Sequence, residues 1–464
     1  MNRRSITRRE VLRAALATGA SLSLLGSLAR AQAQPPAWLD GGPLPWRNWS
    51  GFQHCRPARR LGPASEAELA ALLRDASGGI RPAGAGHSFS GLVPSDGALV
   101  FLDNLAGVVD VDAERLQAEV WAGTRLAQLG PLLDARGQAM PNLPDIDYQT
   151  LGGALATSTH GTGALLGSLS SCVVGLTLAT PGGELLECDA THNAEVFHAA
   201  RSSLGALGVV TRFRLQNAPP FKLVEKTAWR DLDELLANLA SLRGDNRCFE
   251  FYAFPHSQVA LEITTNETDV EPYTLGSDDP DGLQLLQTLF ALTRRLPGIG
   301  TKLYDALLRR SGTTEHADGS YRVLTHPRTT RFNEMEYTVP AEAGPDCLRE
   351  LLRTIREREL DVCFPIECRY VREDDVWLSM FYRRPGFSIS VHQFAELDFA
   401  PYFEAVEPVF WKYEGRPHWG KLHGLDAQRL EALYPRFRDF LDVRRALDPR
   451  GRLVNAHLHT LLGV

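Results

Sequence analysis

The stretch Pro82-Ala-Gly-Ala-Gly-His-Ser-Phe-Ser-Gly91 constrains this chain most, because it places three glycines and one histidine within ten residues. Glycine adopts positive φ and lets the backbone lie against a ligand without an intervening Cβ. The N–H groups of such a loop can bind a phosphate, and His87 lies where an atom of that ligand would reach it. Turn residues follow, and residues 98–102 are typical of a strand, so we predict a loop that joins strand to strand.

The loop does not fit a Rossmann fingerprint, which has the form G-x-G-x-x-G and must open a helix. Gly84 and Gly86 supply the first two glycines, but Phe89 stands where the third is required. No helix is predicted after it, so the loop indicates a different kind of cofactor site.

A second glycine-rich segment, Leu151-Gly-Gly-Ala-Leu-Ala-Thr-Ser-Thr-His-Gly-Thr-Gly163, again places a histidine, His160, among glycines and hydroxyls. One glycine loop is weak evidence for a cofactor. Two such segments, each with a histidine, indicate an extended ligand that is bound along its length.

The two segments resemble the FAD-binding domain (PCMH type) of the vanillyl-alcohol oxidase superfamily, and within it the sugar-lactone and alditol oxidase branch, over roughly residues 46–464. In that branch the histidine of the "G-x-G-H-S" loop carries FAD covalently, which implies a bond to His87. The branch also has an "L-G-V-V-T" strand that passes the flavin. The residues that we expect to bind FAD are Pro82, Ala83, Gly84, Ala85, Gly86, His87, Ser88, Phe89, Gly152, Gly153, Thr157, Ser158, His160, Gly161, Gly163, Gly208 and Val210.

Three short motifs in the second half of the chain carry reactive side chains: "E-x-R" with Glu367 and Arg369, "S-V-H" with His392, and "H-W-G-K" with Lys421. Taken alone, they are typical of a solvated sheet face, a structural histidine and a lysine with a packed stem. The same motifs recur in this order in the lactone and alditol oxidases. The resemblance therefore implies that these residues line a substrate pocket over the flavin.

The residue types suit the oxidation of an alcohol, in which a base takes the hydroxyl proton and the carbon gives hydride to flavin N5. Arg369 and Lys421 are the expected cations that stabilise developing negative charge. Either Glu367 or His392 is the base, and the sequence does not choose between them. The implied substrate is a sugar lactone, an alditol or a related polyol.

Two further questions stay open. O2, giving H2O2, is the first candidate for the electron acceptor, with an oxygen gate among Thr157, Ser158 and Thr159; the alternative is a dehydrogenase that reduces a quinone or a cytochrome. A different class of function is an exported flavin-binding protein without alcohol-oxidising activity.

Residues 1–33 are predicted to be a twin-arginine signal peptide, with Arg8 and Arg9 before a short apolar run and small-residue cleavage sites. The expected location is periplasmic or extracellular. The formal net charge is −7, and removing the six arginines and one glutamate of this segment leaves about −12. This acidity argues against nucleic acid and anionic membrane surfaces, and no other stretch is long enough to span a membrane.

The rest of the chain predicts an α+β protein with a FAD-binding domain at 46–219 and a substrate domain at 220–464, which contains an antiparallel sheet with helices. The scattered cysteines indicate neither a metal site nor a disulfide framework. Expected elements are helices at 63–79, 124–136 (with a break at Gly130-Pro131), 231–242, 283–309 and 342–360, a hairpin at 173–188, and a surface loop at 266–282.

Overall fold

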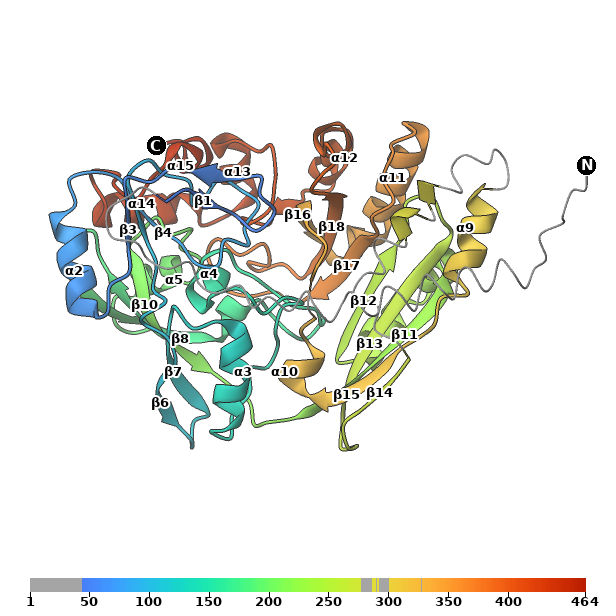
Figure 1. Cartoon of the computed structure of the whole chain (residues 1–464), viewed down its shortest axis with the longest axis horizontal. Coiled ribbons are helices and arrows are strands. Elements are labelled where there is room, and N and C mark those ends of the chain that lie inside the picture. The colour runs from blue at the N-terminus through green and yellow to red at the C-terminus, as the bar shows by residue number, and fades with distance from the viewer. Residues whose placement is uncertain (1–43, 277–285, 289, 292–299, 327) are drawn as a thin grey trace, which may run out of the picture. The chain divides into compact units, whose positions relative to one another are not determined.

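The computed structural model describes residues 44–276, 286–288, 290–291, 300–326 and 328–464, so the predicted signal peptide lies outside the described residues. Within them, residues 46–216 form a small parallel sheet of order β3-β5-β4 and an antiparallel sheet of order β6-β7-β10-β8-β9, in which β10 lies between β7 and β8 (Figure 1). The strands are β1 (Trp46–Arg47), β2 (His54–Cys55), β3 (Arg59–Leu61), β4 (Ile80–Pro82), β5 (Ala98–Val100), β6 (Val108–Asp112), β7 (Gln117–Trp121), β8 (Val173–Ala179), β9 (Leu185–Asp189) and β10 (Val209–Gln216). The helices are α2 (Glu66–Asp75), α3 (Leu126–Asp134), α4 (Leu151–Ala156), η1 (Leu169–Cys172) and α5 (Ala194–Ala200).

The glycine loop connects β4 to β5, which pair in parallel, so the predicted strand-to-strand connection is confirmed. The predicted helix at 63–79 is α2, and its start follows the capping pattern: Ser65 Oγ accepts the N–H of Glu68, 3.1 Å away. The second glycine segment differs from the expected loop, because its first six residues form α4 with Thr150 as the N-cap.

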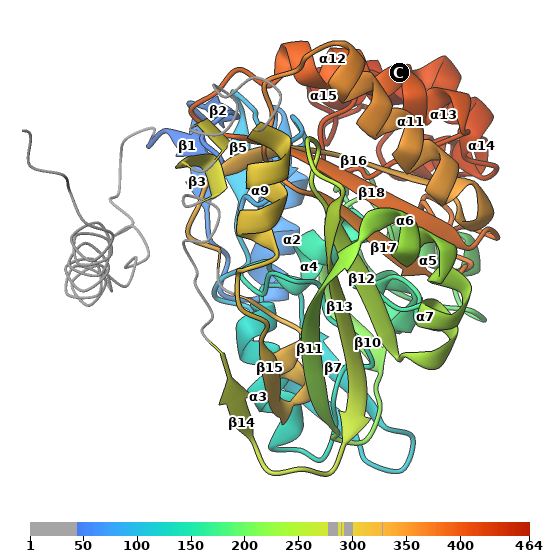
Figure 2. The ribbon, with the colours of Figure 1, turned by 90° about the vertical axis from the view of Figure 1, so that its right-hand side faces the viewer.

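The second half of the chain builds a large antiparallel sheet of order β14-β15-β11-β13-β12-β17-β18-β16-β19 within the described residues, and Figure 2 shows its long strands side by side. These strands are β11 (Lys222–Asp231), β12 (Cys248–Ala253), β13 (Val259–Thr268), β14 (Tyr273–Leu275), β15 (Glu315–Gly319), β16 (Phe332–Pro340), β17 (Ile366–Val371), β18 (Gly386–Phe394) and β19 (Arg416–Pro417). The accompanying helices are α6 (Leu232–Ala237), α7 (Leu239–Asp245), α9 (Gly300–Leu308), α10 (Ser320–Val323), η2 (Ala341–Ala343), α11 (Gly344–Glu357) and α12 (Ala400–Lys412).

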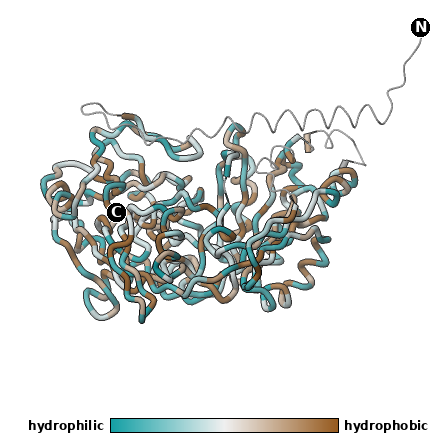
Figure 3. The backbone as a smooth tube through the Cα atoms, turned by 60° about the horizontal axis from the view of Figure 1, so that its bottom comes forward, coloured by the Kyte–Doolittle hydropathy of each residue, from teal (hydrophilic) through white to brown (hydrophobic). Residues whose placement is uncertain are grey.

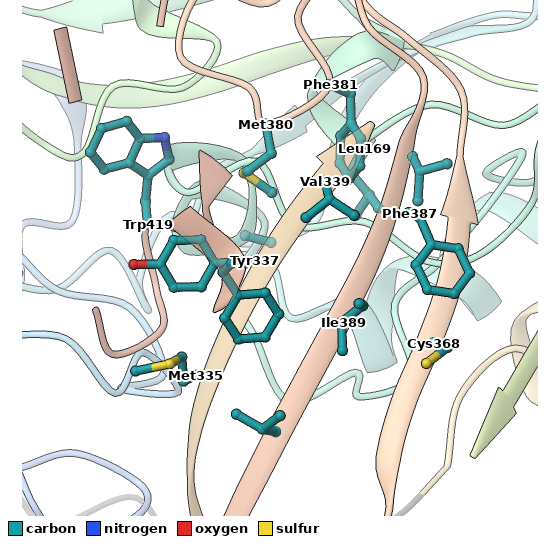
Figure 4. Packing of buried hydrophobic residues seen from close by; sticks show 14 of the residues in the cluster. Leu169, Met335, Tyr337, Val339, Cys368, Met380, Phe381, Phe387, Ile389 and Trp419 are labelled. Carbon is teal, nitrogen blue, oxygen red and sulfur yellow. The ribbon is translucent and has the colours of Figure 1, made fainter. Parts of the chain in front are cut away.

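The strands β16, β18 and β17 have one apolar and one polar face, although both faces are buried. Figure 4 shows the apolar face, where Met335, Tyr337 and Val339 of β16 pack beside Phe387 and Ile389 of β18. Helices α11 and α12 lie on these strands. Because side chains alternate along a strand, the even-numbered residues of β16 and β18 point to the opposite face.

The last residues of the chain return to the elements formed by residues 46–216. The helices α13 (Ala427–Leu433), α14 (Phe437–Leu447) and α15 (Ala456–Leu462) pack on one another through α13, and α14 also contacts α5. Leu453 packs in an apolar cluster with residues of α2, β4, β5, β8 and β10. Asn455 Nδ2 donates to the carbonyls of Gly91 and Pro94, so the C-terminal segment holds the end of the glycine loop.

Three expectations need correction. Gly130-Pro131 does not break α3; instead Gly130 packs so closely against Tyr321 that a Cβ would lie 2.6 Å from the tyrosine Cβ. The helix expected at 231–242 is divided into α6 and α7 at Asn238. The expected loop at 266–282 begins as strand, because β13 pairs with β11 as far as Thr268 and β14 follows.

The mixed α and β architecture with an antiparallel sheet in the second half confirms the predicted fold class. Figure 3 shows hydrophilic and hydrophobic residues interleaved along the described backbone. No helix in this part of the chain is long and apolar enough to cross a membrane. The expected boundary at Pro219-Pro220 lies between β10 and β11, and it stays a prediction.

Candidate active site

Two cavities meet beside the glycine loop. The first, of about 1070 Å³, lies among β4, α4 and the start of β10, and the second, of about 980 Å³, lies on the polar face of the large sheet. Both are lined by His87, Ser88, Gln149 and Thr157. We call them the cofactor cavity and the substrate cavity.

Glycines line the cofactor cavity where a larger residue would close it or could not adopt the backbone conformation. A Cβ on Gly84 would lie 2.3 Å from Thr150 Oγ1, so the glycine loop and the N-terminus of α4 are in contact. Gly86 and Gly205 have φ values of +74° and +63°, which L side chains rarely adopt. The result is a long backbone-lined cradle of the kind that an extended, phosphate-containing cofactor requires.

His87 stands at the junction of the two cavities. Its ring stacks between Trp49, at a centroid distance of 5.3 Å, and Tyr148, at 6.0 Å. Neither ring nitrogen has a hydrogen-bond partner among the described residues. Burial, with the positive charges of Lys421 and Arg125, lowers the pKa of His87 to about 4, so the imidazole is neutral and has a free lone pair at neutral pH.

The residues expected to bind FAD divide into three groups. Those on the cofactor cavity are Pro82, Ala83, Gly84, Ala85, Gly86, His87, Ser88, Gly152, Gly153, Thr157, Gly208 and Val210. Phe89 and His160 line the substrate cavity instead.

Ser158, Gly161 and Gly163 line neither of these cavities, and their part in binding FAD stays a prediction. Ser158 is fully buried with a φ of +55°, and the amide of Gly163 donates to the carbonyl of Tyr370. The chain turns away from the cradle after Thr157, because α4 ends there. Gln149, Thr150 and Gly205 line the cofactor cavity and were missed; the glycine before "A-L-G-V-V-T" was the available signal for the last of them.

The polar face of the large sheet forms one wall of the substrate cavity. Cross-strand pairing puts Glu336 of β16, Ser390 of β18 and Glu367 of β17 in one row, and Glu334 opposite His392 in the next. The four predicted catalytic residues all line this cavity, namely Glu367, Arg369, His392 and Lys421.

Each oxygen of Glu367 accepts a hydrogen bond from a neighbouring side chain. Its Oε1 accepts from the Tyr252 hydroxyl at 2.7 Å, and Arg369 donates to its Oε2. Arg369 also lies 3.6 Å from Glu250, whose pKa burial raises to about 8. Of these two carboxyl groups, Glu367 is the closer to the guanidinium.

Lys421 is held between two buried carboxylates that the sequence motifs did not reveal. Its Nζ donates to Glu334 Oε2 at 2.5 Å and lies 4.0 Å from Glu336 Oε2. Burial opposes ionisation of Glu334, but Lys421 and His392 overcome it and lower its pKa to about 2. Both carboxylates are charged at neutral pH, so Lys421 is a compensated cation.

His160 and Glu336 form a second buried pair. His160 Nδ1 faces the carbonyl of Gly161 at 2.8 Å, and Nε2 faces Glu336 Oε1 at 2.6 Å. Burial opposes ionisation of Glu336, but the contact with His160 holds the pKa of this carboxyl well below its ordinary value. Both ring nitrogens face oxygen atoms, so these two contacts fix the orientation of the His160 ring.

His392 is fixed in orientation. Its ring stacks on Phe364 with centroids 4.8 Å apart and meets the edge of Phe332 at 5.0 Å. Nδ1 lies 3.3 Å from the carbonyl of Pro365, which can only accept a hydrogen bond. Nε2 lies 3.6 Å from Glu334 Oε1.

Comparisons with known proteins identify the family of the chain. Residues 213–461 match the family described as D-arabinono-1,4-lactone oxidase, and residues 57–189 match the FAD binding domain. An L-gulono-1,4-lactone dehydrogenase of Mycobacterium tuberculosis is 37% identical, over 90% of this chain and 99% of that protein. The chain belongs to the D-arabinono-1,4-lactone oxidase family. An L-gulonolactone oxidase of Bos taurus is also similar, with 33% identity over 89% of this chain and 97% of that protein.

Among solved structures, the chain resembles cholesterol oxidase from B. sterolicum, with a TM-score of 0.73 and 16% identity over 92% of this chain and 99% of that chain. At this identity the likeness concerns the fold alone. Membership of the D-arabinono-1,4-lactone oxidase family makes the chain an FAD-dependent oxidoreductase and confirms the predicted sugar-lactone oxidase branch and the cofactor. The glycine cradle and the His87 ring, whose nitrogens make no hydrogen bond among the described residues, are compatible with FAD.

Proposed function

We propose that this chain oxidises a CH–OH group of a sugar lactone, an alditol or a related polyol. The observation that carries the proposal is the substrate cavity, whose wall presents charged and hydrogen-bonding groups and which adjoins the cofactor cavity at His87. Such a wall suits a molecule rich in hydroxyl groups. The relatives named for lactones support the same class of substrate.

We propose that His392 is the base and that Glu367 orients the hydroxyl. FAD, when bound, accepts the hydride that the substrate carbon loses. With its proton on Nδ1, toward the carbonyl of Pro365, His392 would receive the hydroxyl proton at Nε2, whereas both oxygens of Glu367 already accept hydrogen bonds from Tyr252 and Arg369. Arg369 offsets the charge of Glu367, and Lys421 offsets that of Glu334 and Glu336, which lowers the repulsion of a developing alkoxide by these carboxylates.

Anaerobic bleaching of the flavin tests this function. The purified holoenzyme is mixed with a panel of aldonolactones and alditols, and its flavin absorbance is followed; we expect at least one of them to bleach it, and a sterol to leave it oxidised. His392→Gln should be reduced about a hundredfold more slowly. If dithionite bleaches the flavin but no lactone or polyol does, the chain is a flavin-binding protein without this activity.

We propose that FAD is attached covalently through His87. The support is the neutral imidazole at the junction of the cavities, free of hydrogen bonds within the described residues, together with the family membership. Acid-precipitated protein should keep its yellow colour, and His87→Ala should release its flavin into the acid supernatant. Complete release from the unmodified protein would contradict the bond.

We propose O2 as the electron acceptor, so that one alcohol and one O2 give one carbonyl product and one H2O2. Thr157 lines both cavities, Thr159 lines the substrate cavity, and Ser158 lines neither, which favours the two threonines as candidates for an oxygen gate. The similar proteins include both an oxidase and a dehydrogenase. Admitting air to the bleached enzyme should restore the flavin colour and release H2O2; slow recovery in air with rapid recovery on adding a quinone would instead indicate a dehydrogenase.

We propose export by the twin-arginine route to the periplasm or the cell exterior. The support is the sequence of residues 1–33 alone. Replacing Arg8 and Arg9 by lysine should leave precursor in the cytoplasm with FAD bound. Normal export of that variant would indicate the upstream Arg3-Arg4 pair or another route.

A further inference from the structure

Glu334 is shared between the proposed base and the neighbouring cation. Its Oε1 lies 3.6 Å from His392 Nε2, and its Oε2 lies 2.5 Å from Lys421 Nζ. The side chain is only 4% exposed, so water screens neither contact effectively. One carboxylate charge therefore acts on two groups at once.

The charged groups that face His392 come from three segments of the chain. Glu334 lies opposite it on β16, and Glu367 lies on β17. A ring nitrogen of His392 and one carboxylate oxygen of each glutamate lie within 4.8 Å of one another. Lys421 reaches the group through Glu334. The charge of Glu367 is directed at Arg369, so Glu334 is the carboxylate that remains to act on the imidazole.

We propose that Glu334 sets the pH at which His392 can accept the hydroxyl proton, and that Lys421 limits this effect by holding the same carboxylate. The inference rests on the proposed function in taking His392 as the base. The proton leaves the hydroxyl oxygen and binds His392 Nε2, which then faces Glu334 Oε1 as an imidazolium. A carboxylate at this distance stabilises the imidazolium, and an ammonium on its other oxygen weakens that stabilisation.

The proposal predicts opposite effects of two neighbouring substitutions. Glu334→Gln removes the negative charge, so the titration midpoint of His392 should fall by about one pH unit. Lys421→Met removes the ammonium from the Glu334 carboxylate, so more of the negative charge acts on the imidazole. The titration midpoint of His392 should then rise by about one pH unit. Glu334→Asp keeps the charge and should keep the midpoint near that of the unchanged protein.

The direct measurement is an NMR titration of the holoenzyme labelled with 13C at histidine Cε1, in which the His392 signal is the one that His392→Gln removes. Glu336→Gln is the matched control, because Glu336 is two residues along the same strand face and contacts His160 rather than His392. It should move the His392 midpoint by much less than Glu334→Gln. The proposal would be overturned if the His392 midpoint were the same in the unchanged protein, in Glu334→Gln and in Glu334→Asp. This comparison does not depend on whether Lys421→Met folds.

The pH profile of anaerobic flavin reduction separates this inference from the proposed function. If His392 is the base, the acid limb of the profile should move with the NMR midpoint in each variant. A midpoint that moves while the kinetic profile stays fixed would remove His392 as the base and leave its coupling to Glu334 intact. If His392→Gln is reduced slowly but Glu334→Gln leaves the His392 midpoint unchanged, His392 remains the proposed base and the effect of Glu334 on its titration is rejected.

Discussion

Lys421 is held by two buried carboxylates, so its replacement does more than remove a cation from the cavity. Lys421→Met should slow flavin reduction about a hundredfold. It should also lower the free energy of unfolding by about 3–5 kcal/mol, because it leaves Glu334 buried without its cation. Lys421→Met combined with Glu334→Gln should recover most of that stability and little of the rate.

Stopped-flow reduction at saturating substrate and urea unfolding of the same preparations measure the two effects separately. Recovery of the rate together with the stability in the double variant would show that Lys421 acts on the fold and not on the reaction. Loss of rate without loss of stability in Lys421→Met would show that water reaches Glu334 and replaces the ammonium.

The sequence motifs identified four residues of the substrate cavity but missed the two carboxylates that hold Lys421. The segment Asn333-Glu-Met-Glu-Tyr337 has the same spacing as the "E-x-R" motif, with acidic residues two apart on a strand. Such a pair is ordinarily solvated. Its burial depends on β18 beside it and on the distant segment 418–421 above it, and neither can be read from the local sequence.

At the scale of helices and strands, sequence patterns predicted the elements whose hydrogen-bond partners lie nearby in the chain. The hairpin at 173–188 is β8 and β9 with its turn at Pro181, and the helix at 342–360 is α11, whose apolar residues recur on one face. The patterns failed where a distant partner decides the conformation. The segment around Thr268 is strand because Lys222 pairs with it, and nothing in its own composition indicates this.

The contact between the glycine loop and α4 gives a prediction at this scale. Gly84→Ala should reduce the flavin content of purified protein, because the new Cβ would lie 2.3 Å from Thr150 Oγ1, which caps α4. The overpacking should cost about 1–3 kcal/mol. Gly78→Ala is the matched control, since a Cβ there has no atom within 4 Å.

The ratio of flavin to protein absorbance, with thermal unfolding of each variant, provides the measurement. Full flavin content in Gly84→Ala would mean that the loop and α4 can separate without loss of the cofactor. An equal loss in Gly78→Ala would point to a general effect of alanine in this region.

Across the whole molecule, Arg81 connects segments that are far apart in the chain. Its buried guanidinium donates to the carbonyls of Leu92, Leu204, Gly205 and Leu453, without an acidic partner in these contacts. Arg81→Met should therefore lower the free energy of unfolding by about 3 kcal/mol or more, because four carbonyls lose a charged donor.

Arg59→Met is the control, because Arg59 is exposed and belongs to the same sheet; it should change stability by less than about 0.5 kcal/mol. Urea unfolding of both variants is the measurement. Equal stability of Arg81→Met and Arg59→Met would mean that water replaces the guanidinium at its carbonyls.

The return of the C-terminal segment has a consequence for the order of events during synthesis. The glycine loop leaves the ribosome first, but the carbonyl of Leu453 that Arg81 binds and the Asn455 amide that holds Gly91 are made more than 360 residues later. A nascent chain therefore exposes an unfinished cradle until these residues have been made. We expect FAD capture to begin only after residues 453–455 have left the ribosome, so that a ribosome stalled before them would display a colourless protein.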